Sequence, residues 1–134
     1  MAANITPIFP KGPTAKTRVV ISTANTNRDG TGTIVDVIDA AGADGAQVDG
    51  VQIKANVTTT AGMVRFYVHD AANWTLLDEV IVTAITVGAD TKSFGSYWVP
   101  PGGVLRLPSG YKLGAAPHNG ESFHLRADVH TLTG

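Results

Sequence analysis

Apolar and polar residues alternate along several stretches of the chain. At residues 51–57 every second side chain is apolar, and the same alternation recurs at residues 64–69 and 123–129. A period of two places apolar side chains on one face of a β-strand and polar side chains on the other. We therefore predict strands with one core face and one solvent face, and we expect polar positions such as Arg65 and Tyr67 to face solvent.

Most other apolar runs are short, rich in β-branched and aromatic residues, and bounded by Gly, Pro, Asn or Asp. This pattern is typical of strands separated by turns, and no segment has a convincing helical period. We predict strands at residues 17–23, 33–39, 47–57, 63–69, 74–84, 91–99, 103–107, 111–115 and 122–132. Sheets with one apolar face are best buried by packing two of them together. The predicted fold class is all-β, an antiparallel β-sandwich that is jelly-roll-like.

The first fourteen residues differ from the rest of the chain. They contain three prolines, which cannot donate backbone hydrogen bonds and so disfavour regular pairing. We predict an extended N-terminal arm at residues 1–14 and a single β-sandwich domain at residues 15–134. The arm also carries the apolar residues Ile5, Ile8 and Phe9. We predict that they bind a partner; the alternative is that they cap one end of their own sandwich.

The stretch NRDGTGT at residues 27–33 has the composition of a phosphate-binding loop. A P-loop, however, contains a lysine and leads into a helix, whereas this stretch has no lysine and leads into a predicted strand. The pair Asp29-Gly30 suits a tight turn with positive φ. We therefore predict a hairpin turn here, with the return strand beginning at Thr33.

Three aspartates, Asp39, Asp44 and Asp49, recur at intervals of five residues. Calcium loops place oxygen ligands at closer, alternating positions and end in a glutamate, which this segment lacks. A turn with Asp44-Gly45 at its tip is the favoured interpretation. A calcium site shared with a neighbouring loop is the alternative.

The predicted last strand has four polar side chains on one face: His124, Arg126, Asp128 and His130. Histidines on one strand face can share a zinc ion, but Arg126 lies between them and would repel a cation. We interpret the four residues as a partner-binding face of mixed sign, where Asp128 of one chain meets Arg126 or His130 of another. This interpretation predicts a homo-oligomer, most simply a trimer.

Composition excludes several classes of function. Of 134 residues 43% are hydrophobic and 16% charged, and the formal net charge is -1. Such a chain has no long-range attraction for nucleic acid or for anionic membranes, and we expect neither as a partner. The absence of cysteine excludes disulfides and thiolate chemistry. No secretory signal or long apolar run is present, so we expect synthesis in the cytoplasm without export.

The remaining residues form no catalytic pattern. None of the serines lies in a Gly-x-Ser-x-Gly motif, and the adjacent Asp78 and Glu79 should point to opposite faces of a strand. We therefore expect no enzymatic activity, no cofactor and no bound metal. Four aromatic residues are candidates for stacking on a sugar: Trp74, Tyr97, Trp98 and Tyr111. Because Tyr97 and Trp98 are adjacent, one of the two should face solvent or a partner.

Three stretches, TANTNRDGTGTIVDV, AAGADGAQVDGVQIKANVTTTAGMVRFYVHD and LPSGYKL, precede the alternating last strand. Together they resemble small structural proteins encoded among the virion genes of tailed bacteriophages, from about Ile5 to Leu132. The resemblance implies a non-catalytic β-sandwich of the head decoration or cement type. Such a protein would bind the major capsid protein on the outer surface of the capsid, often as a trimer, after synthesis in the host cytoplasm. The alternative is a glycan-binding host-recognition module of a phage fibre or tail.

Overall fold

The computed structural model describes residues 9–10, 14–39, 42 and 44–133. Over these residues the chain forms ten strands and no helix, so the described part contains no helix that could cross a membrane. The strands are β1 (Phe9–Pro10), β2 (Thr14–Ile21), β3 (Val35–Ile38), β4 (Ala46–Ala55), β5 (Gly62–His69), β6 (Trp74–Val82), β7 (Gly95–Trp98), β8 (Leu105–Leu107), β9 (Lys112–Pro117) and β10 (Phe123–Thr133). Each predicted strand is present, with its ends shifted by a few residues.

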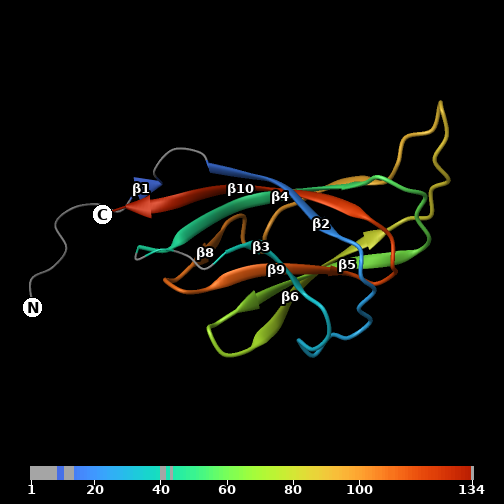
Figure 1. Cartoon of the computed structure of the whole chain (residues 1–134). Helices are drawn as coiled ribbons and strands as arrows, with labels where there is room; N and C mark the ends of the chain where they lie inside the picture. The colour runs from blue at the N-terminus through green and yellow to red at the C-terminus, as the bar shows by residue number, and fades with distance from the viewer. Residues whose placement is uncertain (1–8, 11–13, 40–41, 43, 134) are drawn as a thin grey trace, which may run out of the picture.

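The strands form two antiparallel sheets that pack face to face, as Figure 1 shows. The first sheet has the order β1-β10-β4-β7, with β2 also paired to β10 and β8 also paired to β4. The second sheet has the order β3-β9-β5-β6. From β2 to β10 the chain passes repeatedly from one sheet to the other, and only β5 and β6 are consecutive strands that pair directly. This alternation is the topology of a jelly roll, which confirms the predicted fold class.

The core lies between the two sheets and follows the predicted alternation. Ile53 and Leu125 point inward from the first sheet, and Phe66 points inward from the second; each is at most 1% exposed. Trp98 of β7 stacks on Phe66 of β5 with ring centroids 4.0 Å apart, which joins the two layers. Its indole N–H donates to Asp78 Oδ2 at 2.8 Å, so the buried ring leaves no unpaired donor. Full burial of each large apolar side chain contributes about 1.5–3 kcal/mol.

The structure describes three residues of the segment predicted as the N-terminal arm, namely Phe9, Pro10 and Thr14. Thr14 begins β2 and therefore belongs to the sandwich. Phe9 and Pro10 form β1, whose backbone pairs with residues 132–133 at the end of β10, a position at a sheet edge where proline is tolerated. Ile5 and Ile8 lie outside the described residues, and for Phe9 only this backbone pairing is defined.

The hairpin prediction for NRDGTGT is wrong. β2 lies in the first sheet and β3 in the second, so residues 22–34 cross between layers instead of reversing within one. The turn chemistry itself is confirmed, since Gly30 has a φ of 87°. The predicted turn at Gly45 is also confirmed: its φ is 84° and its N–H donates to the carbonyl of Gly42 at 2.9 Å.

The crossing segment covers polar side chains that the sequence predicts to face solvent. Arg65 is 1% exposed and Tyr67 is fully buried, although both point away from the core. Arg65 donates to Glu79 Oε2 at 2.9 Å, to the carbonyl oxygen of Asn25 at 3.1 Å, and contacts His118 Nδ1 at 3.1 Å. The Tyr67 hydroxyl donates to the carbonyl oxygen of Asn27 at 2.8 Å. These bonds fix the crossing segment on the outer face of the second sheet.

Candidate functional site

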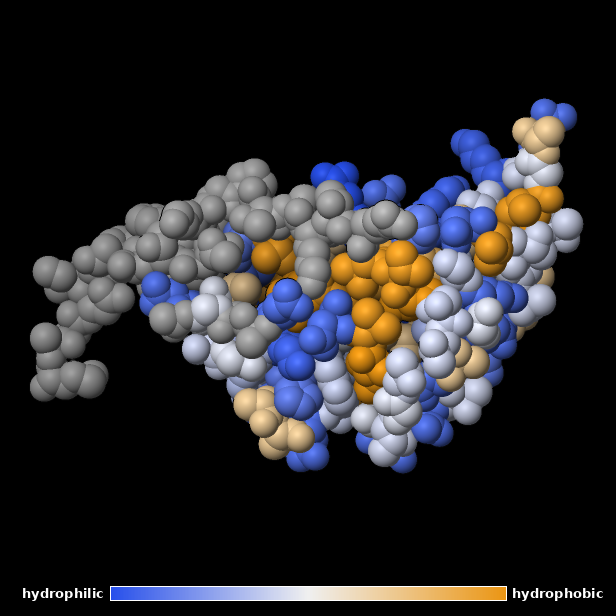
Figure 2. All heavy atoms as spheres, viewed as in Figure 1, coloured by the Kyte–Doolittle hydropathy of each residue, from blue (hydrophilic) through white to orange (hydrophobic). Residues whose placement is uncertain are grey.

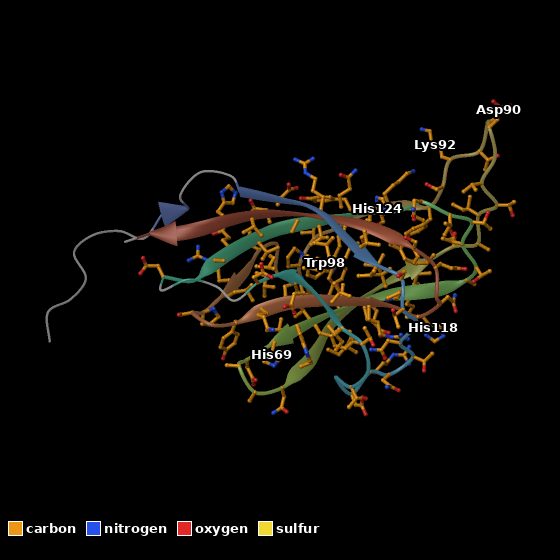
Figure 3. All side chains as sticks on the ribbon, viewed as in Figure 1. His69, Asp90, Lys92, Trp98, His118 and His124 are labelled. Atoms are coloured by element: carbon orange, nitrogen blue, oxygen red, sulfur yellow. The ribbon has the colours of Figure 1, made fainter. Side chains whose placement is uncertain are left out.

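The outer face of the first sheet carries the four polar residues predicted on the last strand. His124, Arg126, Asp128 and His130 alternate along β10 with the inward-facing Phe123, Leu125, Ala127 and Val129, which are at most 8% exposed. Figure 3 shows His124 on the upper layer, on the side away from the second sheet. The predicted partition of the strand into a core face and a polar face is therefore observed.

The neighbouring strand β4 adds two polar side chains to this face. Lys54 lies opposite His124 in the antiparallel register, and Gln52 lies opposite Arg126. These four residues and Leu125 line an open hollow of about 410 Å³. Neither Gln52 nor Lys54 was predicted as a site residue, although both occupy polar positions of the alternation in β4.

A tyrosine lies across β4 because that strand has a glycine at the crossing point. A Cβ on Gly50 would lie 2.6 Å from a ring carbon of Tyr97, so only glycine leaves space for the ring. The ring starts on β7, passes over β4, and its hydroxyl donates to Asp128 Oδ2 on β10 at 2.8 Å. Half of Tyr97 stays exposed. Three strands are thus joined by one aromatic side chain on the surface.

The position of Tyr97 affects its acidity. Partial burial of the hydroxyl raises the pKa of Tyr97 above its ordinary value, and the hydrogen bond to Asp128 raises it further. The charges of Asp128 and Asp49 act in the same direction, whereas Arg126 opposes them. Removing a proton from this hydroxyl would place a second negative charge beside Asp128, which disfavours the phenolate.

We expect the Gly50→Ala variant to lower the pKa of Tyr97 toward the ordinary value of about 10. The new methyl group would displace the ring from β4 and from Asp128, because both need the same space. Ultraviolet titration of the phenolate measures the change, and a Tyr97→Phe variant identifies which transition belongs to Tyr97. An unchanged titration in Gly50→Ala would show that the ring does not depend on the glycine.

The end of the face beyond Tyr97 has acidic groups with partners inside the chain. A bulge in β4 at Asp49 places its carboxylate 2.7 Å from His130 Nε2. Gln47 Nε2 donates to the other oxygen of Asp49 at 3.0 Å. Asp128 accepts from Tyr97. The sequence predicts that Asp128 meets Arg126 or His130 of another chain, but the structure gives both Asp128 and His130 partners in the same chain.

No metal-binding cluster is present in the part of the chain that the structure describes. Three or more His, Asp or Glu side chains do not come together there in a way that could hold a metal ion. This result includes Asp39, Asp44 and Asp49, the residues of the alternative calcium interpretation. The face therefore offers hydrogen bonds, charges and one exposed ring for binding.

The candidate aromatic residues are separated in the structure. Tyr97 is 50% exposed and Trp98 only 4%, which confirms that one of the pair faces outward. Trp74 lies on the other sheet, where its ring is 4.8 Å from that of His69 and Lys112 Nζ is 5.6 Å from its centroid. Tyr111 packs against the core. These rings do not form a shared platform for a sugar.

Comparison of the sequence with models of known protein families finds no match, and comparison with curated protein sequences finds none either.

Proposed function

We propose that this chain is a structural protein of a bacteriophage virion, a decoration or cement protein that binds the major capsid protein on the outer surface of the head. The observation that carries the proposal is the outer face of the first sheet, where Tyr97, Arg126 and Gln52 are presented together on paired strands. Tyrosine and arginine are enriched at the centres of protein interfaces. The resemblance of the sequence to phage virion proteins gives the class of partner.

The loop between β6 and β7, residues 83–94, supports binding on this side of the molecule. It rises above the first sheet at one end, as Figure 1 shows, and Figure 2 shows hydrophobic side chains on it. Val87 on this loop is 39% exposed. The base of the loop is fixed by reciprocal backbone hydrogen bonds between Thr59 and Ile85 at 3.0 and 3.1 Å. A partner bound to the outer face would therefore contact a loop whose base is already fixed before binding.

A decoration protein needs binding free energy and no chemistry. A subunit that binds the assembled shell and not its separated parts stabilises the shell by mass action. The small formal net charge of -1 allows many copies to lie close together on a particle without strong mutual repulsion.

The proposal is tested with phage particles assembled without this chain. Purified protein is added at increasing concentration, bound protein is measured after sedimentation, and the particles are imaged by cryo-electron microscopy. We expect saturable binding, density for a jelly roll on the outside of the head, grouping in threes, and a higher disruption temperature of the decorated particles. Absence of binding to the head at any concentration contradicts the proposal.

Deleting residues 1–8 is expected to weaken attachment with little loss of stability. The deletion removes Ile5 and Ile8 but keeps β1 and all later strands. Burial of each side chain at a partner is worth about 1.5–3 kcal/mol, less the cost of ordering the segment. We expect at least about tenfold weaker binding to particles and an unchanged melting temperature. A large loss of melting temperature with unchanged binding would mean that these residues stabilise their own domain.

A glycan-binding module is the second candidate, and the exposed Tyr97 ring is the observation that favours it. The ring lies beside Gln52 and Asp128, side chains that can bond to sugar hydroxyls. A glycan array with saturable binding that is lost in Tyr97→Ala would favour this function over decoration. Among the side chains that the structure describes, Tyr97 has the one strongly exposed aromatic ring on this face, whereas sugar platforms use several rings.

A further inference from the structure

The two ends of the outer face differ in how their charges are paired. At one end, Asp49 and Asp128 accept hydrogen bonds from His130, Gln47 and Tyr97. The other end, which we name the cationic shelf, consists of Gln52, Lys54, His124 and Arg126. Across the described residues, no carboxylate forms a salt bridge with Lys54 or Arg126.

The cationic shelf therefore holds positive charge that the chain itself does not compensate. Lys54 Nζ is held in place by the carbonyl oxygen of Ser93 at 3.0 Å, a neutral partner that leaves its charge in place. The β6–β7 loop stands beside the shelf, and Figure 3 shows Lys92 on it above the sheet. Asp90 lies on the same loop and both side chains are exposed, so their charges offset each other and the local excess of positive charge comes from Lys54 and Arg126. This local excess contrasts with a whole-chain charge of -1.

We propose that the cationic shelf binds an acidic polypeptide segment of the partner, with acidic side chains at alternate positions. The proposal deepens the proposed function and rests on it for the identity of the partner as a capsid subunit. Lys54 and His124 form one cross-strand row, and Gln52 and Arg126 form the next. Successive rows on one sheet face are about 6.8 Å apart, which is also the spacing of alternate side chains in an extended peptide. Carboxylates at alternate positions of such a peptide can meet both rows.

The chemistry of the shelf favours a peptide over other anions. The Arg126 guanidinium can bind a carboxylate through two hydrogen bonds, and the Gln52 amide can both donate to a carboxylate and accept from a peptide N–H. Asp49 and Asp128 on the same face would repel a continuous phosphate backbone. A second copy of this chain is disfavoured as the occupant, because the carboxylates that its outer face could offer already have partners.

The test uses a labelled peptide of five Glu-Ser repeats as the probe, with a Gln-Ser peptide of equal length as the uncharged match. Binding is followed by fluorescence anisotropy at low and at physiological salt. We expect saturable binding of the Glu-Ser peptide that weakens with salt and no binding of the Gln-Ser peptide. In the Lys54→Glu/Arg126→Glu variant, two attractions become repulsions, and we expect at least about tenfold weaker binding.

Two further variants control for folding and for total charge. Lys54→Gln/Arg126→Gln removes the charges without reversing them and should bind with intermediate affinity. Arg106→Glu changes the net charge by the same amount as Lys54→Gln/Arg126→Gln but at another place on the same sheet, since Arg106 is exposed and lies opposite Gln47 at the other end of β4. It should bind the Glu-Ser peptide nearly as well as the unchanged protein. Circular dichroism melting confirms that each variant is folded.

Several results would overturn the inference. The inference fails if the charge-reversed variant binds the Glu-Ser peptide as tightly as the unchanged protein, or if Arg106→Glu loses as much binding as the charge-reversed variant. It also fails if a sulfated glycan binds more tightly than the Glu-Ser peptide, or if the protein self-associates in a way that needs Lys54 and Arg126. The same variants are then added to undecorated particles. If the unchanged protein binds particles and the charge-reversed variant binds equally well, the shelf inference fails while the proposed function stands. If neither binds, the proposed function fails, whatever the peptide result.

Discussion

Gly30→Val should destabilise the protein by about 3 kcal/mol or more, since two penalties of about 1–3 kcal/mol each coincide at this residue. Gly30 has a φ of 87°, a conformation that a β-branched residue adopts only with strain. A Cβ at this position would also overlap the backbone carbonyl oxygen of Trp74, which cannot move aside as a side chain can. Gly45→Val should behave alike, because Gly45 has a φ of 84° and a Cβ there would overlap the carbonyl oxygen of Leu107.

Variants at two other glycines separate the effect of backbone strain from the effect of overlap between a new Cβ and neighbouring atoms. Gly102 has a φ of 89° but no atom within 4 Å of a Cβ position, so Gly102→Val should show the strain alone. Gly88 has neither feature, and Gly88→Val should lie within about 0.5 kcal/mol of the unchanged protein. Urea unfolding at equilibrium measures all four variants. If Gly30→Val unfolded at the same urea concentration as the unchanged protein, the crossing segment would not need the observed turn, and a ligand-binding role for NRDGTGT would regain support.

Arg65→Met is expected to lower the free energy of unfolding by about 3 kcal/mol, although methionine keeps much of the apolar volume. The substitution removes the donor to the carbonyl of Asn25 and the contacts to Glu79 and His118, all made by a side chain that is 1% exposed. The Asn25 carbonyl would lose its donor beneath the crossing segment. Urea unfolding gives the magnitude, and proteolysis within residues 22–34 reports whether that segment is released.

The matched control is Arg28→Met. Arg28 donates to the same oxygen of Glu79 at 2.8 Å, but its side chain is 53% exposed. A salt bridge to an exposed arginine contributes little, so we expect a change of less than about 1 kcal/mol. If both substitutions lowered the free energy of unfolding by similar amounts, the stabilisation would come from the ion pair with Glu79 and not from the burial of Arg65.

The sequence was sufficient to predict the strands and the layered fold because both depend on local alternation. The core face of β10 and its polar face, including His124 and Arg126, follow directly from a period of two. The path of residues 22–34 was not predictable in this way. A glycine with positive φ serves a hairpin and a crossing between sheets equally well, so the local signal at Gly30 does not distinguish them.

The same limit explains which site residues the sequence did not predict. Tyr97 meets Asp128 over Gly50 only because β7, β4 and β10 are neighbours in a particular register. Those strands are far apart in the sequence, and a shift of one residue would turn the side chains to the opposite face. The burial of Arg65 likewise depends on a segment from another part of the chain.

The place of β10 in the first sheet affects how the protein can fold during its synthesis. β10 is the last of the described strands to leave the ribosome, yet it lies between β2 and β4, two of the earliest. Those two strands have no pairing with each other, so they must wait for residues 123–133 before their sheet can close. Pairings between strands distant in sequence also slow folding. We expect the nascent chain to expose its apolar faces until residues 123–133 have been synthesised, which makes it a client for chaperones of the cell that produces it.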